Sequence, residues 1–390
     1  MAVNLAHNRG ACRRGPAGVP HPEEWLAARA PGGILGAMST ARMMPAWRLT
    51  QFGTPPELQQ VPVPTVSAGE VLVKVAGNGL CHSDVGMMEA GAVAPPFPSW
   101  QLPFTLGHEI AGWVEEAGAG VSGFSRGQPV ILVATHSDGT CAYCRAGQDN
   151  NCDAGSAGRG YGRDGGLAPF VHLASPRPLI ALKNLDPRTA GPLADAAATS
   201  MHAVRRVLPR LAGGSSAVVI GAGGLGSFAV QLLRALTPAR VIAVDVNPAR
   251  LDYARRLGAH ETLEGVRERT AEDLKSLTGG RGAEAVLDFV GIDATITAGL
   301  IAVRRTGAYG LIGAGMGRLN APWFHLLPKD GEVFNFTGST IADLREVVTL
   351  AEAGRLVNDT ERFAFGDTLK AYARLAQGTL LGRAVVAPEG

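Results

Sequence analysis

The segment between Ala217 and Asp245 constrains the possible folds more than any other part of the chain. An apolar run leads into a glycine-rich turn, an apolar helical pattern follows over Leu225–Leu236, and a second apolar run ends at Asp245. The glycines of the turn are Gly221, Gly223, Gly224 and Gly226. Such glycines permit a tight turn and a close approach of the backbone to a pyrophosphate, and the N-terminus of the following helix attracts negative charge.

The context of these glycines predicts a dinucleotide-binding unit, with an ordinary loop as the alternative, because they follow a strand, open a helix and precede an acidic residue. A carboxylate at Asp245 would accept hydrogen bonds from the adenosine ribose and repel a 2′-phosphate, so the sequence favours NAD over NADP. Arg250 lies close enough in sequence to soften this preference, and Asp245 could instead be a surface residue. The chain is therefore predicted to be a nicotinamide-dependent oxidoreductase.

Strands alternate with helices from Ser215 onward, which predicts an α/β fold with a parallel sheet covered on both faces. The expected strands are 217–220, 241–245, 285–289 and 307–312, and the expected helices are 225–236, 248–257 and 294–303. Short β-rich runs between Trp47 and Val133 predict a small β-barrel or sandwich, and Thr189–Arg206 is expected to form one helix. We expect domains at 43–198 and 199–330, with 331–390 returning to the first; this last stretch should hold a strand, the helix Ile341–Ala353 and the closing strand Ala384–Ala387.

Composition excludes several classes of function. The chain has 390 residues with a net charge of only +2 and no basic stripe interleaved with aromatic residues, so we expect no nucleic-acid partner. No apolar run reaches the roughly 18 residues that would suggest a membrane span. Residues 1–42 are rich in Arg, Ala, Gly and Pro and are expected to be a disordered extension. An organellar transit peptide is the alternative, and Met38, Met43 and Met44 are plausible starts.

Three of the five cysteines lie within twelve residues, which indicates a metal site in a reducing compartment and hence a cytoplasmic protein. The spacing Asp138-x2-Cys141-x2-Cys144-x7-Cys152 suits a closed structural zinc loop, with Asp138 where a fourth cysteine would be expected. Carboxylate oxygen binds zinc, so a site of three cysteines and Asp138 is chemically reasonable. A three-ligand or empty site is the alternative.

Taken together, these motifs resemble the zinc-containing medium-chain alcohol dehydrogenases. The segment Gly107-His108-Glu109-x2-Gly112-x5-Gly118-x2-Val121-x5-Gly127-x2-Val130 closely matches the signature of that family. The resemblance runs from about residue 43 to the C-terminus and includes the cysteine loop and the glycine fingerprint in the family's order. It implies a GroES-like catalytic domain and a Rossmann domain with the cleft between them, with NAD and two zinc ions per chain as cofactors.

The resemblance also implies the ligands of a catalytic zinc, namely Cys81 and His108. The cysteine that is the third ligand in many members has no counterpart here, and Asp195 stands at the matching place, as in a bacterial branch that uses aspartate. One thiolate and one carboxylate neutralise Zn²⁺ as two thiolates would. Glu109 is expected near the metal when its fourth position changes, and Asp84 is expected to fix the ring of His108.

The remaining roles that the resemblance implies are those of the proton relay and the cofactor contacts. Ser83 would take the proton of the alcohol, unless it is a simple turn hydroxyl, and Gly86 stands where the family often has the histidine that ends the relay. His82 would face the cofactor phosphates. The expected cofactor contacts, each of which could equally be structural, are Thr199 and Val290 near the nicotinamide and Arg383 at the pyrophosphate.

The substrate pocket is predicted from three residues that could equally belong to the core, namely Trp100, Phe336 and Thr337. The leading hypothesis is reversible NAD-linked oxidation of primary or secondary alcohols to aldehydes or ketones. The rivals are a zinc-free quinone or enoyl reductase of the same superfamily and a non-catalytic NAD-binding protein. The expected partners are a small-molecule alcohol or carbonyl compound and further copies of the chain, in a homodimer or homotetramer.

Overall fold

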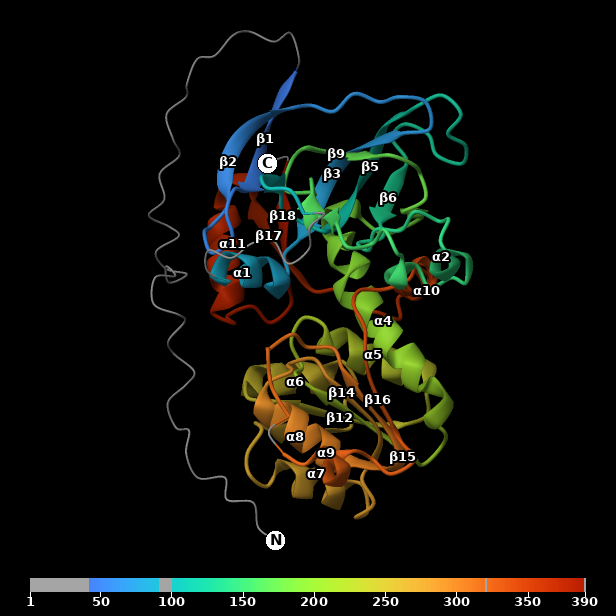
Figure 1. Cartoon of the computed structure of the whole chain (residues 1–390), viewed down its shortest axis with the longest axis vertical. Coiled ribbons are helices and arrows are strands. Elements are labelled where there is room, and N and C mark those ends of the chain that lie inside the picture. The colour runs from blue at the N-terminus through green and yellow to red at the C-terminus, as the bar shows by residue number, and fades with distance from the viewer. Residues whose placement is uncertain (1–41, 91–99, 320, 389–390) are drawn as a thin grey trace. The chain divides into compact units, whose positions relative to one another are not determined.

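The computed structural model describes residues 42–90, 100–319 and 321–388 (Figure 1). The extension expected over 1–42 lies outside the described residues, apart from Arg42. The described chain forms two compact units. One contains Ala196–Gly338 and Ala353–Val357; the other contains the described residues up to Asp195, Ser339–Glu352 and the residues from Asn358 onward. The part of the chain that the structure describes has no helix long and apolar enough to cross a membrane.

The first unit is built on a six-stranded sheet in the order β13-β12-β11-β14-β15-β16, and every pair in it is parallel. Its strands are β11 (Ser216–Ile220), β12 (Arg240–Asp245), β13 (Glu261–Glu264), β14 (Ala283–Asp288), β15 (Val303–Leu311) and β16 (Glu332–Asn335). Its helices are α4 (Ala196–Val207), α5 (Gly226–Leu236), α6 (Pro248–Arg256), α7 (Thr270–Leu277), α8 (Asp293–Ala302) and α9 (Trp323–Leu326). This strand order is that of a Rossmann fold, with the reversal between β11 and β14.

Burial explains why these segments form strands. All five residues of β11 are buried, as expected for the centre of a parallel sheet covered on both faces. The predicted α/β class is confirmed, while β13 and α7 were absent from the sequence prediction. The half-buried, mostly polar residues of β13 give no apolar run, because β13 is an edge strand.

The structure corrects the domain boundary predicted after residue 330. β16 pairs in parallel with β15 through Val333 and Tyr309, so the chain is still in the Rossmann sheet at that point. It joins the other unit only at Ser339. The predicted boundary after residue 198 also differs slightly, because it falls inside α4, whose first residue, Ala196, already belongs to the Rossmann unit.

The second unit holds a seven-stranded sheet and a three-stranded sheet. The larger has the order β10-β6-β5-β3-β18-β17, with β9 also paired to β3; the smaller has the order β2-β1-β4, and β7 pairs with β8. The strands are β1 (Met43–Leu49), β2 (Glu57–Pro62), β3 (Val71–Gly79), β4 (Phe104–Thr105), β5 (Glu109–Ala117), β6 (Pro129–Leu132), β7 (Gly158–Arg159), β8 (Gly162–Arg163), β9 (Phe170–Leu173), β10 (Leu179–Ala181), β17 (Thr360–Ala364) and β18 (Arg383–Ala387). The helices are α1 (His82–Glu89), α2 (Ala142–Arg145), α3 (Pro187–Ala190), α10 (Ile341–Glu352) and α11 (Thr368–Ala376).

The long strand β3 organises this unit, because it pairs with β5, β9 and β18. The C-terminal strand β18 therefore lies in the same sheet as β3 and β5, which come from the first third of the chain. β3 ends at Gly79 and β5 begins at Glu109, and these two residues are partners in the sheet register. The residues that follow β3 and precede β5 are therefore brought to one place.

Candidate active site

Four possible metal ligands converge where β3 ends and β5 begins. One ligand atom from each of Cys81, His108, Glu109 and Asp195 lies within 4.8 Å of the others. The Cys81 Sγ and Asp195 Oδ2 atoms are 3.8 Å apart, and His108 Nε2 is 3.4 Å from the same oxygen. A thiol, an imidazole and a carboxylate are a donor set that suits Zn²⁺.

Asp195 reaches this cluster because the expected helix over Thr189–Arg206 is broken, which corrects that prediction. The structure has α3, a 3-10 turn over Gly191–Ala194, and then α4 from Ala196. Asp195 lies between the last two with φ −124° and ψ −62°. Pro192 lacks an N–H group and cannot continue a regular helix, so the chain turns and the Asp195 carboxylate points at the cluster.

Asp84, the predicted partner of the His108 ring, lies directly behind that ring. The Asp84 Oδ1 atom lies 3.3 Å from His108 Nδ1, while Oδ2 accepts hydrogen bonds from the Tyr372 hydroxyl at 3.0 Å and from the Cys81 backbone N–H at 3.3 Å. Asp84, His108 and Tyr372 are buried. A carboxylate behind Nδ1 fixes the ring and leaves Nε2 as the atom that faces a metal.

Glu109 and Arg383 form a buried ion pair beside the cluster. Arg383 also donates to the Leu80 carbonyl at 2.8 Å. The second Glu109 oxygen, Oε2, is buried and has no hydrogen-bond partner among the described residues. Burial raises the pKa of Glu109 to about 7, although Arg383 opposes the shift. An orphaned carboxylate oxygen next to a thiol and an imidazole fits a bound cation. The predicted contact of Arg383 with a pyrophosphate stays a prediction.

Ser83 also lies at this site, in the first turn of α1, where its hydroxyl meets a residue that the sequence analysis missed. The Ser83 Oγ and Tyr161 hydroxyl oxygens are 2.5 Å apart, and the Tyr161 oxygen is 3.3 Å from His108 Nε2. Burial raises the pKa of Tyr161 well above its usual value, so the phenol keeps its proton. Tyr161 belongs to no spacing motif; the available signal was an aromatic residue flanked by Gly160 and Gly162. His82, next to Ser83, is exposed.

The predicted pocket residue Trp100 packs near this tyrosine. The ring centroids of Trp100 and Tyr161 are 5.7 Å apart, and Trp100 stacks on Phe52 at 6.1 Å. Phe336 and Thr337 lie in the Rossmann unit instead. The ring of Phe336 contacts that of His202, with centroids 4.5 Å apart, and Thr337 is exposed. Their place in a pocket stays a prediction.

The cysteine loop brings together a second group of possible ligands. Ligand atoms of Asp138, Cys141, Cys144 and Cys152 lie within 4.8 Å of one another. The backbone N–H groups of Thr140 and Cys141 donate to Asp138 Oδ1 at 2.7 and 3.3 Å. The hydrogen bond from Thr140 is the main reason that the pKa of Asp138 falls to about 2, so its carboxylate is charged near neutral pH. Three thiols and a carboxylate in this arrangement fit a structural zinc ion.

The glycine turn has the local geometry that a dinucleotide site needs. Gly221 has a φ of 87°, which other residues rarely adopt, and an added Cβ at Gly226 would lie 1.8 Å from the Gly221 carbonyl oxygen. Asp245 ends β12 and accepts hydrogen bonds from the Ala222 and Asn247 backbone N–H groups at 2.8 and 2.9 Å. Arg250 lies 4.0 Å from the Asp245 carboxylate. The carboxylate is therefore held beside the turn, at the carboxyl end of the sheet.

Val290 lies beside the same turn and is held there by Asp288, which the sequence analysis did not single out. An added Cβ at Gly221 would lie 2.6 Å from Val290 Cγ2. The buried Asp288 carboxylate accepts hydrogen bonds from the Val290 and Gly291 N–H groups at 2.8 and 3.0 Å and from the Tyr309 hydroxyl at 2.8 Å. Thr199, in α4, is buried. The nicotinamide contacts expected for Val290 and Thr199 stay predictions.

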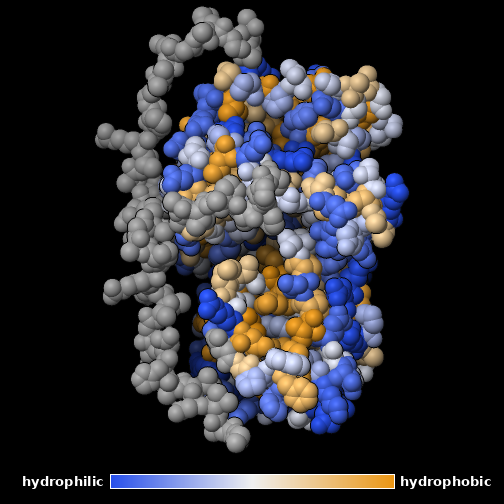
Figure 2. Space-filling view, viewed as in Figure 1, coloured by the Kyte–Doolittle hydropathy of each residue, from blue (hydrophilic) through white to orange (hydrophobic). Residues whose placement is uncertain are grey.

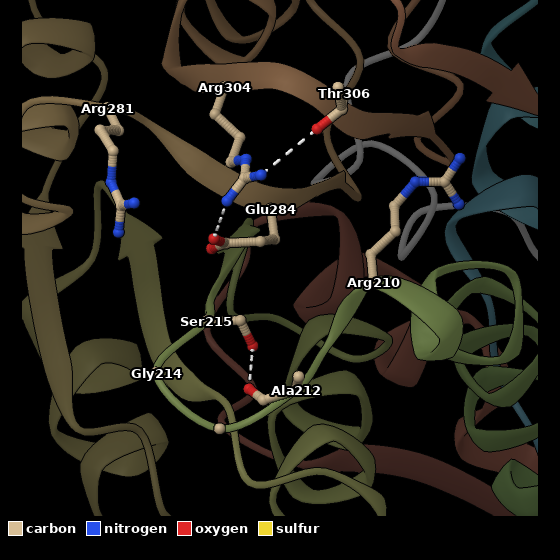
Figure 3. A pocket seen from close by; sticks show the side chains of 9 residues that line it. Arg210, Ala212, Gly214, Ser215, Arg281, Glu284, Arg304 and Thr306 are labelled. Atoms are coloured by element: carbon tan, nitrogen blue, oxygen red, sulfur yellow. Dashed lines mark hydrogen bonds and ion pairs between the residues drawn. The ribbon is translucent and has the colours of Figure 1, made fainter.

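A separate cavity of about 350 Å³ lies at the amino ends of β11, β14 and β15, whereas the glycine turn lies at the carboxyl ends of the strands (Figure 3). Arg304 crosses it and donates to Glu284 at 2.7 Å, and Arg210 and Arg281 also line it. Ligands of open parallel sheets bind at the carboxyl ends of the strands. This cavity is therefore distinct from the glycine turn.

Comparison with known proteins identifies the family. Residues 67–183 match the family model described as the alcohol dehydrogenase GroES-like domain, and residues 224–353 match the one described as zinc-binding dehydrogenase. An NAD-dependent alcohol dehydrogenase of Sulfolobus acidocaldarius is 36% identical over 88% of this chain and 99% of that protein. A D-arabinose 1-dehydrogenase (NADP(+)) of Saccharolobus solfataricus is 32% identical over 87% of this chain and 96% of that protein.

Solved structures agree with this match. The alcohol dehydrogenase of the archaeon Aeropyrum pernix superposes with a TM-score of 0.82 at 35% identity, covering 88% of this chain and all of that one. The two matched models correspond to the two units of the fold, and the expected GroES-like and Rossmann classes are confirmed. The predicted cofactors agree with the zinc-binding dehydrogenase model and with the NAD-dependent relative of Sulfolobus acidocaldarius. The chain thus belongs to the zinc-binding, medium-chain alcohol dehydrogenase family.

Proposed function

We propose that this protein catalyses the reversible, NAD-linked oxidation of primary or secondary alcohols to aldehydes or ketones. The observation that carries the proposal is the convergence of Cys81, His108 and Asp195, with the Ser83 hydroxyl beside them in the same unit. Convergent metal ligands and a hydroxyl on a rigid scaffold are what alcohol activation requires. The glycine turn supplies the site for the hydride carrier.

The chain's own residues divide the chemistry between them. Cys81, His108 and Asp195 would hold zinc, which as a Lewis acid makes the alcohol proton easier to remove. Asp84 holds the His108 ring in one orientation, and Ser83 accepts the proton of the alcohol hydroxyl while it releases its own to solvent water. The turn from Gly221 would hold NAD, which when bound would supply the acceptor for the hydride of the alcohol carbon. The proposed site also includes residues with the roles expected from the sequence. These are His82 at the cofactor phosphates, Glu109 near the metal, Thr199 and Val290 near the nicotinamide, and Arg383 at the pyrophosphate.

Two zinc ions per chain are part of the proposal, one in the catalytic cluster and one in the cysteine loop. Each group offers enough ligands for one ion, since four possible ligand atoms lie within 4.8 Å of one another in each. Asp138 is the proposed fourth ligand of the loop and Asp195 the third protein ligand of the catalytic ion. Metal analysis of the purified protein should find two zinc ions per chain, and a Cys144→Ser variant should retain one.

Two observations bear on the identity of the nicotinamide cofactor. The Asp245 carboxylate lies beside the glycine turn, which favours NAD, because a 2′-phosphate would meet a negative charge. Arg250 lies 4.0 Å from that carboxylate and would partly offset this repulsion. We therefore infer a preference for NAD over NADP, and the ratio of kcat/KM for the two cofactors measures it.

The experiment that separates the readings is a turnover assay with a matched metal analysis. The zinc-loaded protein with NAD should reduce the cofactor over a panel of primary and secondary alcohols, and Cys81→Ser should abolish that activity. Turnover of quinones or enones without zinc would instead support a zinc-free reductase of the superfamily. NAD binding with no turnover of any substrate would support a non-catalytic protein.

We also propose that the protein forms a homo-oligomer through the Rossmann unit. Large apolar side chains of this unit are exposed between residues 316 and 333, namely Met316, Leu319, Trp323, Phe324, Leu327 and Val333, with Phe324 75% exposed. Apolar residues gather on the visible face of this unit (Figure 2). β16, which contains Val333, is an edge strand with one free side, so it is available for pairing with a second copy.

Light scattering tests the oligomer directly, since a dimer or tetramer should give two or four times the chain mass. Trp323→Ser with Phe324→Ser should shift the protein toward the monomer. A small-molecule alcohol or carbonyl compound is the only other partner that we propose. We place the protein in the cytoplasm, because thiol ligands such as those of the cysteine loop need a reducing compartment.

A further inference from the structure

Tyr161 is placed where a tyrosine hydroxyl has no purely structural partner. Its oxygen is 2.5 Å from Ser83 Oγ and 3.3 Å from His108 Nε2, and its ring centroid is 4.6 Å from that of His108. Tyr161 is half-buried, and a tyrosine that serves only as packing usually gives its hydroxyl to a backbone carbonyl or a structural side chain. Here both hydrogen-bond partners of the hydroxyl among the described residues, Ser83 and His108, belong to the site itself.

The backbone around Tyr161 holds the side chain in this position. Gly160 and Gly162 on either side have φ angles of 71° and 79°, in the region that favours glycine. An added Cβ at Gly160 would lie 2.8 Å from the Gly107 backbone, and one at Gly162 would lie 2.8 Å from the Trp100 side chain. The loop that carries Tyr161 therefore packs closely against the segment before His108 on one side and against Trp100 on the other.

Aromatic packing fixes the tyrosine ring from the side away from His108. Trp100 lies 5.7 Å from the Tyr161 ring, centroid to centroid. Trp100 is in turn packed against Phe52 at 6.1 Å and Phe104 at 5.9 Å, and its indole N–H donates to the Ser156 carbonyl. The tyrosine is therefore wedged between this aromatic group and the histidine, and its hydroxyl has little freedom to leave Ser83.

The Ser83–Tyr161 contact matters because a serine hydroxyl has one proton and two lone pairs. An isolated serine rotates freely and spends only part of its time with a lone pair toward an incoming alcohol. A hydrogen bond to a fixed phenol restricts that rotation and leaves an acceptor position directed at the cluster. The geometry thus points to a function for Tyr161 that is exerted through Ser83.

We infer that Tyr161 is a positioning residue for alcohol oxidation, whose hydroxyl holds Ser83 in the orientation that accepts the alcohol proton. The inference rests on the proposed function. No proton is transferred to Tyr161 in this step: the alcohol proton goes to Ser83 Oγ, Ser83 releases its own hydroxyl proton to solvent water, and the Tyr161 hydroxyl remains a hydrogen-bond partner throughout. The same contact orients Ser83 toward the oxygen of any bound alcohol, reactive or not.

The test is Tyr161→Phe in the zinc-loaded full chain, because this substitution keeps the ring and its packing and removes only the hydroxyl. We expect kcat for alcohol oxidation to fall about tenfold, the effect of one lost hydrogen bond, with KM for NAD and zinc content unchanged. Binding of 2,2,2-trifluoroethanol to the NAD-loaded protein, measured by calorimetry, should weaken about fivefold. Tyr253→Phe, in α6 of the Rossmann unit, is the matched control and should leave both values unchanged.

A double-mutant cycle distinguishes positioning from independent action. Ser83→Ala alone should lower kcat by about a hundredfold or more, the range for general acid–base groups. Adding Tyr161→Phe to Ser83→Ala should cost nothing further, because the residue that Tyr161 positions is gone. A further tenfold loss in that background would overturn the inference, as would wild-type kcat and trifluoroethanol affinity in Tyr161→Phe alone.

Failure of the inference and failure of the proposed function give different results. Suppose that the wild-type protein turns over alcohols and Ser83→Ala does not. If Tyr161→Phe then has no effect, the inference about Tyr161 is wrong and the proposed function still holds. If the wild-type protein holds zinc and NAD but oxidises no alcohol, the proposed function itself is wrong. Melting temperatures of all variants within a few degrees of the wild type show that folding is not the cause.

Discussion

Replacing Asp84 by asparagine should weaken zinc binding at the catalytic cluster and leave the cysteine loop untouched. The Asp84 carboxylate lies 3.3 Å from His108 Nδ1 and accepts from Tyr372 at 3.0 Å, both in buried surroundings. Asparagine has the same shape, but it carries no charge and has one acceptor oxygen instead of two. If that oxygen keeps its bond with Tyr372, the amide NH₂ faces His108 Nδ1 and favours the tautomer with the proton on Nε2, the nitrogen that must bind the metal.

The expected magnitude follows from the loss of one outer-shell partner. Such losses weaken metal affinity about 10- to 100-fold, which corresponds to about 1.4–2.7 kcal/mol. Competition with a chromophoric chelator measures it, and two zinc ions per chain should separate into one weakened and one unchanged. Asp343→Asn is the matched control, since Asp343 is also buried but pairs with Thr340 at the start of α10. Wild-type zinc affinity at both sites in Asp84→Asn would refute the reasoning.

Three further changes test other parts of the structure. Arg383→Met should lower the free energy of unfolding by about 3 kcal/mol in a guanidinium titration, because it leaves the buried Glu109 without its partner, and an unchanged midpoint would contradict this. Cys144→Ser should lower the melting temperature while the catalytic cluster keeps its zinc and initial activity; loss of both metals would show that the two groups are not independent. Asp245→Ser should raise kcat/KM with NADP relative to NAD about tenfold or more, and an unaltered ratio would mean that the carboxylate does not select the cofactor.

The features that could be predicted best from the sequence are those whose geometry depends on a short segment of the chain. The glycine turn needs positive φ at Gly221 and close packing at Gly226, and only glycine meets both demands, so the β11–α5–β12 unit could be predicted from one short segment. The cysteine loop was equally readable, because ligands close together in sequence reach one ion with little help from the rest of the fold. The family signature around His108 then allowed the dispersed ligands to be named.

Other features could not be predicted from the sequence, because they depend on contacts between residues that are far apart in the chain. β16 lacks a strong apolar run, and only its pairing with β15 shows that the Rossmann unit continues to Gly338. The helix predicted over 189–206 was wrong because apolar periodicity continues across this stretch, whereas the backbone leaves helical geometry at Asp195. Arg383 and Glu109 are 274 positions apart, and the sequence around either residue does not predict their ion pair.

What the sequence alone determined, then, is the set of chemical groups: a pyrophosphate turn with an acidic neighbour, two zinc-like ligand sets and a serine beside one of them. What only the tertiary structure decided is their placement. The pairing of β3 with β5 brings Cys81 close to His108. The helix break before α4 positions Asp195 at the same cluster. The loop at Gly160 and Gly162 positions Tyr161 against Ser83. The spacing of residues in the sequence predicts contacts within one turn or loop. Contacts across a sheet depend on strand register and packing, which no single segment of the sequence specifies.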